Sequence, residues 1–491
     1  MLMKRLKGLI LCFCIMGCNI SDSTKSEEDL PNILFLFADD YTFDAIHALG
    51  NEIIHTPNLD RLIQNGTQFS QSFNMGGWNG AICVASRSMI ITGKTIWNAK
   101  ALTEQWAKKE NLESVQKSWG KLMEEKGYQT YMSGKWHVSI DPKNVFQTVR
   151  NIRPGMPGDF FKKGNKKGYD RPREGEIDLW SPTDSRNRGF WEGGKHWSEV
   201  AKDDALDFIK QSKERSAPFF MYVAFNAPHD PRQSPQSFLD RYPLDSILLP
   251  ENWLPEYPYK DAIGNPKTLR DEALAPFPRT PYAIKTHIKE YYAIISHLDE
   301  QIGKIMSALE ASGKADNTYI FFTADHGLSV GKHGLLGKQS MFDHSIRVPL
   351  TLAGPGIPKN KTVDHEIYLQ DIMATTLEMA NIEAPASLEF KSFLSLAKGL
   401  EDQPLYPEGI YGAYVNHQRM IRKNQFKLIF YPKIKKTLLF DLEQDPLEMN
   451  DLYEDDEYQE TAKELFEGLL ILQKKMNDTL DLRKIYSFDS V

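Results

Sequence analysis

Residues 32–40 read NILFLFADD, a continuous apolar run that ends in two adjacent acidic residues, Asp39 and Asp40. A short apolar run without polar alternation is typical of a strand that is buried on both faces, as in a parallel sheet covered by helices. The acidic pair therefore marks the point where a buried strand is expected to open into a loop.

Three further segments, residues 128–137, 217–231 and 317–327, repeat this design of an apolar run that ends in polar residues. The polar residues that follow these runs are Lys135 and His137, then Asn226, His229 and Asp230, and finally Asp325 and His326. Ligands of open α/β sheets bind beyond the carboxyl ends of the strands, so we expect these side chains to meet at one edge.

Helical patterns separate the four runs. Residues 56–66 and 114–127 each end at a glycine placed to cap a helix, Gly66 and Gly127. Residues 291–313 place apolar side chains on one helical face, namely Ile294, Leu298, Ile302, Ile305 and Leu309. The alternation predicts an α/β fold, with a large, mainly parallel sheet sandwiched by helices over residues 31–400.

The last part of the chain, residues 401–491, has a different character. Two segments, 419–432 and 436–452, look like strands joined by turns. A helical pattern follows, with Ala462, Leu465, Leu469 and Leu472 on one face. We expect a small antiparallel sheet with a terminal helix, packed on the main domain.

The first eighteen residues, MLMKRLKGLILCFCIMGC, combine a basic start with a short apolar stretch and a glycine before Cys18. This pattern predicts a secretory signal covering residues 1–17. IMGC resembles a bacterial lipobox, which implies lipidation of Cys18, and the polar residues 18–30 suit a flexible tether. We expect an exported protein, lipid-anchored in the periplasm or at the outer membrane or cell surface. An ordinary cleaved signal peptide is the alternative.

Of the four cysteines, Cys12 and Cys14 leave with the signal and Cys18 is consumed by lipid, so only Cys83 remains. No disulfide framework is expected. Loss of three basic residues with the signal moves the formal net charge from −7 to −10. An acidic chain of this kind is a poor partner for nucleic acid.

Asp39, Asp40, Asp325 and His326 form two polar pairs at two predicted strand ends. Three carboxylates and one imidazole suit a divalent cation that prefers oxygen ligands, such as Ca²⁺ or Mn²⁺. Each pair taken alone is also a common turn or capping sequence.

Cys83 opens the sequence CVASRSMIITG, which predicts a helix through Thr92 that stops at Gly93. Free N–H groups and the helix dipole favour an anion at such an N-terminus, and Arg87 lies on the same face one turn later. A thiol nucleophile and an ordinary buried cysteine are the alternatives.

The segment CVASR resembles the Cys-x-Pro/Ala-x-Arg signature of type I sulfatases, in the alkaline-phosphatase-like superfamily. The resemblance is to bacterial polysaccharide sulfatases and covers nearly the whole mature chain. It includes NILFLFADD, HTPNLDRLIQNGTQF, GKWH, APHDP, TADHG and HGLLGKQSMFDHSIRVPL. It implies that a maturase oxidises Cys83 to formylglycine (3-oxoalanine), whose hydrate attacks sulfur with one hydroxyl and releases sulfate through the other.

The resemblance also implies roles for individual residues. The metal ligands would be Asp39, Asp40, Asp325, His326 and the modified residue 83. Arg87 and Lys135 would hold the formylglycine oxygens and the developing charge. His137 would deprotonate the second hydroxyl, and His229 and Lys338 would bind the sulfate and protonate the leaving oxygen. His326 stands where the family often has Asn, which leaves Ca²⁺ favoured and Mn²⁺ open, and Ala85 replaces the commoner proline.

A basic, tryptophan-rich stretch indicates the substrate. Its basic residues are Lys162, Lys163, Lys166, Lys167, Arg171 and Arg173, and its tryptophans are Trp180, Trp191 and Trp197. Basic groups beside indole rings suit a sulfated saccharide, with Trp191 and Trp197 as sugar contacts. A solvated charged loop is the alternative. The sequence thus predicts a sulfatase acting on a sulfated carbohydrate. The rival functions are a phosphonate or phosphodiester hydrolase with the same aldehyde and a non-catalytic surface protein that binds sulfated glycans.

Overall fold

The computed structural model describes residues 30–155, 173–176, 180–184, 191–192 and 194–486. The predicted signal, Cys18, residues 18–29 of the tether, and Lys162, Lys163, Lys166, Lys167 and Arg171 of the basic stretch lie outside these residues. Among the helices described, none has the length and apolar character needed to cross a membrane.

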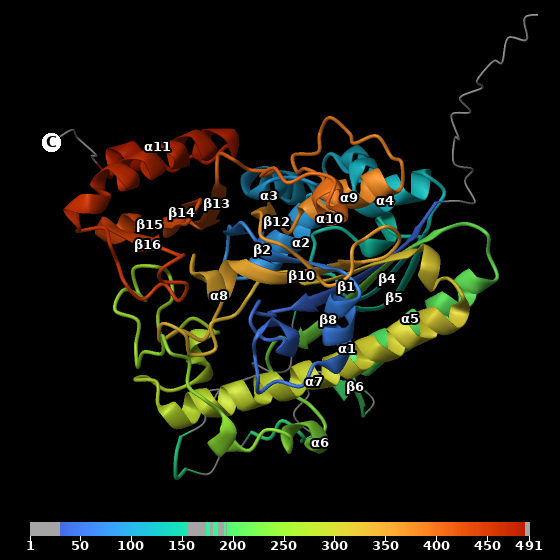
Figure 1. Cartoon of the computed structure of the whole chain (residues 1–491), viewed down its shortest axis with the longest axis horizontal. Coiled ribbons are helices and arrows are strands. Elements are labelled where there is room, and N and C mark those ends of the chain that lie inside the picture. The colour runs from blue at the N-terminus through green and yellow to red at the C-terminus, as the bar shows by residue number, and fades with distance from the viewer. Residues whose placement is uncertain (1–29, 156–172, 177–179, 185–190, 193, 487–491) are drawn as a thin grey trace, which may run out of the picture.

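A nine-stranded sheet forms the centre of the molecule (Figure 1). Its strands are β1 (Asn32–Asp39), β2 (Thr67–Phe73), β4 (Gln129–Lys135), β5 (Thr148–Arg153), β8 (Phe219–Pro228), β9 (Thr318–Ala324), β10 (Arg347–Ala353), β11 (Lys361–Val363) and β12 (Ile367–Tyr368). The main order is β11-β2-β10-β9-β1-β8-β4-β5, and β12 pairs with β2. The predicted parallel arrangement is confirmed for the run from β9 to β5. β10 is the exception, because it pairs antiparallel with both of its neighbours.

The four apolar runs lie next to one another in this sheet. β1 is central, with Ile33 opposite Phe220 of β8 on one side and Tyr319 of β9 on the other. Every residue of β1 and β8 is buried. Continuous apolar sequence therefore formed strands covered on both faces, and their carboxyl ends share one edge.

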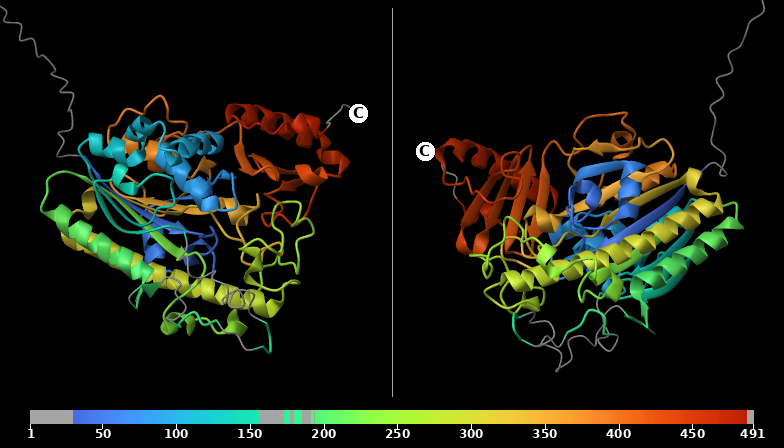
Figure 2. Two further views of the ribbon diagram at one scale, coloured as in Figure 1. Left: turned by 180° about the vertical axis from the view of Figure 1, so that it is seen from behind. Right: turned by 60° about the horizontal axis from the view of Figure 1, so that its bottom comes forward.

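Helices cover both faces, as predicted (Figure 1). Along one face run α1 (Pro57–Gln64), α5 (Trp197–Lys213) and α7 (Pro281–Ser312). The other face carries α2 (Ile82–Thr92), α3 (Ile96–Ala107), α4 (Trp119–Glu125), α9 (Asp371–Met379) and α10 (Leu394–Lys398). The two views of Figure 2 show α5 and α7 side by side, and the predicted apolar face of α7 is fully buried. Two short helices, α6 (Gln236–Leu239) and α8 (Asp343–Ile346), lie in connections.

The two glycine caps have different outcomes. Gly127 follows α4 with φ +96°, and Tyr128 N donates to Met123 O at 3.0 Å, which confirms the predicted C-terminal cap. Gly66 is a correction: α1 ends at Gln64, Asn65 is its cap, and Gly66 has no left-handed φ. A Cβ on Gly66 would lie 2.4 Å from Leu352 O, so close backbone approach explains this glycine.

A second sheet follows near the C-terminus, coloured red at the left of Figure 1. Its strands are β13 (Ile410–Tyr414), β14 (Gln418–Lys423), β15 (Phe426–Tyr431) and β16 (Lys436–Asp441), and its helix is α11 (Gln459–Lys475). The four strands are antiparallel, as predicted. One further strand was not predicted: β3 (Gly76–Gly77), from the first part of the chain, pairs parallel with β13.

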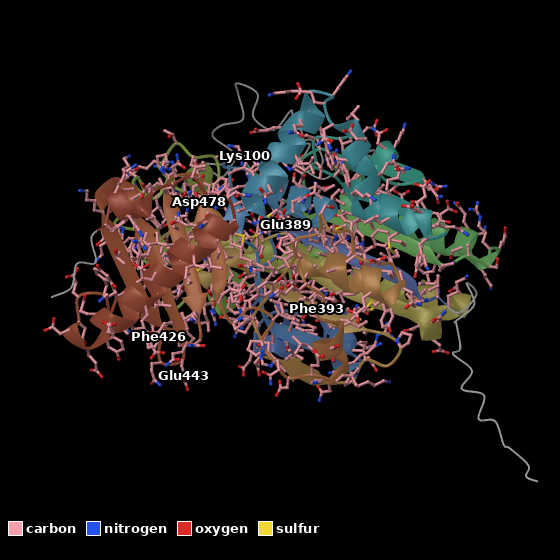
Figure 3. All side chains as sticks on the ribbon, turned by 90° about the horizontal axis from the view of Figure 1, so that it is seen from above. Lys100, Glu389, Phe393, Phe426, Glu443 and Asp478 are labelled. Atoms are coloured by element: carbon pink, nitrogen blue, oxygen red, sulfur yellow. The ribbon has the colours of Figure 1, made fainter. Side chains whose placement is uncertain are left out.

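The end of α11 contacts the helices of the main sheet. Figure 3 shows Asp478 near α3, which carries Lys100, and Asn477 Nδ2 donates to Asn98 Oδ1 at 2.9 Å. Trp97 Nε1 donates to Tyr411 Oη of β13 at 3.1 Å. The second sheet is therefore attached to the first at several points. A minor two-stranded sheet, β6 (Trp191–Glu192) and β7 (Lys195–His196), precedes α5.

Candidate active site and metal centre

The polar residues at the carboxyl ends of β1, β4, β8 and β9 lie together, as the sequence predicts. Two features of the backbone aim adjacent residues at one point. The pairing of β1 with β8 shifts register between Phe37 and Asp39, and Asp40 then adopts a left-handed φ of +64°. His137, two residues after β4, has φ +62°. Left-handed backbone at a residue other than glycine is unfavourable, and such conformations cluster at functional sites.

The predicted cation ligands form a compact donor set. One ligand atom each from Asp39, Cys83, Asp325 and His326 lies within 4.8 Å of the others. Asp40 joins them, because His326 Nε2 lies 3.1 Å from Asp40 Oδ1. His326 Nδ1 is 2.9 Å from Gly327 O, so a proton on Nδ1 leaves the Nε2 lone pair facing the carboxylates.

Two oxygens in this set, Asp39 Oδ1 and Asp40 Oδ2, are buried and accept no hydrogen bond from the described part of the chain. An unpaired buried carboxylate oxygen is costly, and a divalent cation satisfies it. Three carboxylates and one imidazole therefore fit a cation such as Ca²⁺ or Mn²⁺.

Three buried cations match the three carboxylates. Lys135 Nζ donates to Asp39, Lys338 Nζ donates to Asp40 Oδ1 at 2.7 Å, and Arg87 Nε donates to Asp325 Oδ2 at 2.8 Å. Burial opposes ionisation of Asp325, but the neighbouring cations Arg87, Lys135 and Lys338 hold its pKa well below the usual range. A divalent cation would thus make the centre net positive, which suits an anionic substrate.

Cys83 lies in the first turn of α2, as predicted, and is 2% exposed. Its Sγ is 3.2 Å from His137 Nδ1. Burial opposes ionisation of the thiol, yet Lys135 and Lys338 lower its pKa. The residue is thus surrounded by groups that stabilise negative charge on the atom it carries.

Most of the guanidinium of Arg87 is engaged by other protein groups, which the sequence did not predict. Besides Asp325, its guanidinium donates from Nη1 to Lys135 O at 2.8 Å and lies 4.6 Å from the ring centroid of Phe37. Nη2 has no partner among the described residues, so it is the guanidinium nitrogen left for an incoming oxygen. Arg87 therefore ties the end of β4 to the cation ligands.

His137 and His229, the two histidines with predicted catalytic roles, are neutral. Burial, Lys135 and Arg87 lower the pKa of His137 to about 3. Its ring packs on Gly155, where a Cβ would lie 2.6 Å from His137 Cε1. Burial and Lys338 hold the pKa of His229 well below its usual value. His229 Nδ1 is 2.6 Å from Asp230 O, which places the proton on Nδ1 and the lone pair on Nε2.

Lys338, by contrast with His137 and His229, keeps its proton and its positive charge. Burial opposes its charge, but Asp40 and Cys83 hold its pKa well above the usual value. The loop of Lys338 is fixed by Gln339, whose Oε1 accepts from Lys338 N at 3.0 Å and whose Nε2 donates to Asp271 Oδ2 at 2.7 Å.

The structure does not place the tryptophans with these residues. Trp197 begins α5, is 2% exposed and has the guanidinium of Arg153 4.7 Å from its ring centroid, so its faces are not open to a sugar. This corrects the predicted role of Trp197 as a sugar contact. Trp180 is also buried, and the side chain of Trp191 lies outside the described residues.

The sequence also missed contributors. Arg270 and Asp271 belong to the irregular segment before α7, and Arg270 Nη2 is 3.4 Å from His229 Nε2. No strand end or helical period marks them. Adjacent charges in a stretch rich in proline were the only available signal.

Comparison with known proteins identifies the family. The family described as Sulfatase matches residues 31–382, and the family described as N-sulphoglucosamine sulphohydrolase, C-terminal, matches residues 331–475. N-acetylglucosamine-6-O-sulfatase of Bacteroides thetaiotaomicron is 25% identical over 92% of this chain and 88% of its own length. An ulvan-active sulfatase of Formosa agariphila is 25% identical over 98% of this chain and 88% of its own.

Solved structures agree with the fold. One, described as a complex with its substrate D-glucosamine-2-N,6-O-disulfate, has a TM-score of 0.73 and 25% identity, covering 92% of this chain and 99% of the other. The phosphonate monoester hydrolase of Agrobacterium radiobacter has a TM-score of 0.70 at 21% identity, over 91% and 96% of the two chains. The latter likeness concerns the fold alone.

Proposed function

The chain belongs to the sulfatase family, and from this we propose that it hydrolyses sulfate esters of a carbohydrate with residue 83 as nucleophile. One observation carries the proposal. Cys83 Sγ lies within 4.8 Å of ligand atoms of Asp39, Asp325 and His326 and 3.2 Å from His137 Nδ1. A nucleophile, a base and a cation site therefore coincide at one helix N-terminus.

Residue 83 would be used as formylglycine, produced by a maturase, and the cation would be Ca²⁺, with Mn²⁺ as the alternative. The hydrated aldehyde would supply two hydroxyls, one to attack sulfur and displace the sugar alcohol and one whose deprotonation would release sulfate, and the cation would polarise the sulfate oxygens. The donor set of three carboxylates and one imidazole supports the cation assignment.

The chain's own residues supply the proton transfers and the charge. His137 is neutral at physiological pH, so its Nδ1 can take a proton from the group at residue 83. Lys135 and Lys338 attract the sulfate oxygens. Lys338 is protonated, whereas His229 presents a lone pair at Nε2, so Lys338 is the better-placed donor to the leaving oxygen. His229 must first gain a proton to share that role.

The names of the relatives support a sulfated polysaccharide as the source of substrate. One relative acts on N-acetylglucosamine 6-sulfate by its name, and another on ulvan. A protein lipidated at Cys18 and held in the periplasm or at the outer membrane would meet such a substrate outside the cytoplasm. The basic start and the IMGC sequence support this address.

The test is a screen of sulfated oligosaccharides with enzyme produced beside its maturase. We expect sulfate release that is abolished by a chelator and by Cys83→Ala, with intact mass showing the aldehyde at residue 83 in the wild type. A phosphodiester analogue is measured in parallel. Clear preference for the phosphodiester, or full activity of Cys83→Ala, would contradict the proposal. An unmodified thiol at residue 83 in protein produced beside the maturase would favour the non-catalytic glycan-binding function.

A further inference from the structure

Arg270 holds a position beside the reacting groups that neither the family resemblance nor the proposed function uses. Its guanidinium reaches three groups at once. Nη1 donates to Asp230 Oδ2, and Nη2 lies 3.2 Å from Asp230 Oδ1 and 2.6 Å from Asp271 Oδ1. The same Nη2 is 3.4 Å from His229 Nε2. Because arginine only donates, His229 Nε2 faces it as an acceptor.

The guanidinium is held firmly but is not enclosed. Asp230 and Asp271 are both buried, whereas the side chain of Arg270 is 27% exposed. Asp271 is itself fixed through Gln339 to the loop that carries Lys338. Two buried carboxylates thus hold a planar donor at the solvent side of His229, which is a pre-organised arrangement for a ligand.

The charge of this group indicates which ligand chemistry it suits. The single positive charge of Arg270 is already paired with Asp230 and Asp271, so this group offers a second sulfate no unpaired cation. A hydroxyl both donates and accepts, so it can share the paired donors of Arg270 and the paired oxygens of Asp230 without bringing a charge of its own. The site therefore matches an uncharged, hydroxyl-bearing part of a sugar.

We propose that Arg270 and Asp230 form a subsite that hydrogen-bonds a free sugar hydroxyl close to the ester oxygen contacted by His229 and Lys338. The proposal rests on the proposed function, because it takes His229 and Lys338 to mark the leaving oxygen. When the sulfate is on a ring carbon, the hydroxyl of the adjacent ring carbon lies close to that oxygen, and for a 6-sulfate the neighbouring hydroxyl is that of C4. The subsite would select sugars whose neighbouring hydroxyl carries no second sulfate.

The first experiment needs no variant. The probes are N-acetylglucosamine and galactose sulfated at single positions, the deoxy analogues that lack the neighbouring hydroxyl, and the disulfated forms. We expect kcat/KM of the wild type to fall about 10- to 100-fold for the deoxy analogue of the preferred sugar, and also for its disulfated form. Equal kcat/KM for the sugar and its deoxy analogue would overturn the proposal.

The second experiment compares Arg270→Gln with the wild type on the preferred sugar sulfate and on 4-nitrophenyl sulfate, which lacks the hydroxyl. We expect the ratio of kcat/KM for sugar over aryl sulfate to fall about 10-fold or more, and the variant to lose its discrimination against the deoxy sugar. Arg270→Lys should fall between the two. The matched control is Arg61→Gln, which removes an arginine paired with Glu310 near the opposite edge of the sheet.

The outcomes separate the subsite from the proposed function. Equal losses on both substrates would mean that Arg270 acts on the sulfate or through His229, which overturns the subsite and leaves the sulfatase assignment intact. No loss on either substrate also overturns it. A wild type that releases sulfate from none of the probes would instead contradict the proposed function.

Discussion

Asp325 contacts both the arginine of the helix that carries Cys83 and the ligands of the cation site. Oδ2 accepts from Arg87 Nε at 2.8 Å, whereas Oδ1 lies 3.5 Å from His326 Nε2 and accepts from Asp40 N at 3.3 Å. One carboxylate therefore fixes the helix that carries Cys83 and contributes to the cation donor set. Because Arg87 is fully buried, loss of the Asp325 charge would leave an uncompensated cation in the core.

This arrangement predicts how the protein responds to its cation. Because a ligand that binds only the folded state stabilises it, Ca²⁺ or Mn²⁺ at about 100 times its Kd should raise the Tm by roughly 2–5 °C. Asp325→Asn should abolish that rise and also lower the Tm measured without cation. Thermal unfolding with and without cation, together with calorimetric titration, provides the measurement.

The matched control for this experiment is Asp402→Asn, which neutralises an exposed carboxylate paired with His365. The control should retain the full cation-dependent rise in Tm. A rise of the same size in Asp325→Asn would show that the cation binds elsewhere.

At the scale of helices and strands, the sequence predicted correctly those features that a local pattern of residues determines. Buried strands, helix faces and the end of α2 at Gly93 all follow from runs and periods of a few residues. Because parallel strands share a carboxyl edge, the meeting of Asp39, Lys135 and Asp325 followed from the fold class alone.

Contacts between segments far apart in the chain could not be predicted from the sequence. Gly66 is required by the backbone of β10, and the two residues of β3 pair with a strand from the last part of the chain. Trp197 resembled a loop residue, yet His196 caps a helix there and its first turn faces the core. Arg270 enters the site through tertiary packing, which no local period encodes.

The loop between β9 and β10 packs on the second sheet through His333. Its ring stacks on Phe342 with 4.0 Å between centroids, and Nε2 donates to Glu448 O at 3.0 Å. Burial lowers the pKa of His333 to about 4, to which Lys427 and Lys332 add while the Glu448 carbonyl opposes them. In the unfolded chain the imidazole of His333 binds a proton near pH 6.5, whereas in the folded protein it stays neutral until the pH approaches 4.

Stability should therefore decrease as pH falls from about 6.5 towards 4, because the unfolded state binds more protons in that window. His333 alone contributes up to about 3 kcal/mol of this decrease. His333→Phe keeps the aromatic stacking and should flatten the dependence of the unfolding free energy on pH. Denaturant unfolding at several pH values measures the slope, with His55→Phe, at an exposed position, as control. An unchanged slope in His333→Phe would contradict the assignment.

At the scale of the whole molecule, the two sheets share one folding unit. The core beneath the second sheet includes Met75, Ile82 and Met341 beside Ile421 and Leu469, so it draws on segments from both ends of the chain. Ile82 directly precedes Cys83. The position of the nucleophile thus depends on packing against a sheet that carries none of the cation ligands.

We therefore expect one cooperative thermal transition, with sulfatase activity and the near-ultraviolet circular dichroism of the aromatic residues lost together. Gly76→Ala tests the link, because Gly76 has φ +87° and an added Cβ would lie 2.1 Å from Ala413 O of β13. The clash and the strained backbone should cost about 3 kcal/mol or more. Gly50→Ala is the matched control, since Gly50 has φ +101° but nothing within 4 Å of the added Cβ, so only the backbone strain of about 1–2 kcal/mol remains. Two separate transitions, or equal losses in the two variants, would show that the sheets fold independently of the β3–β13 pairing.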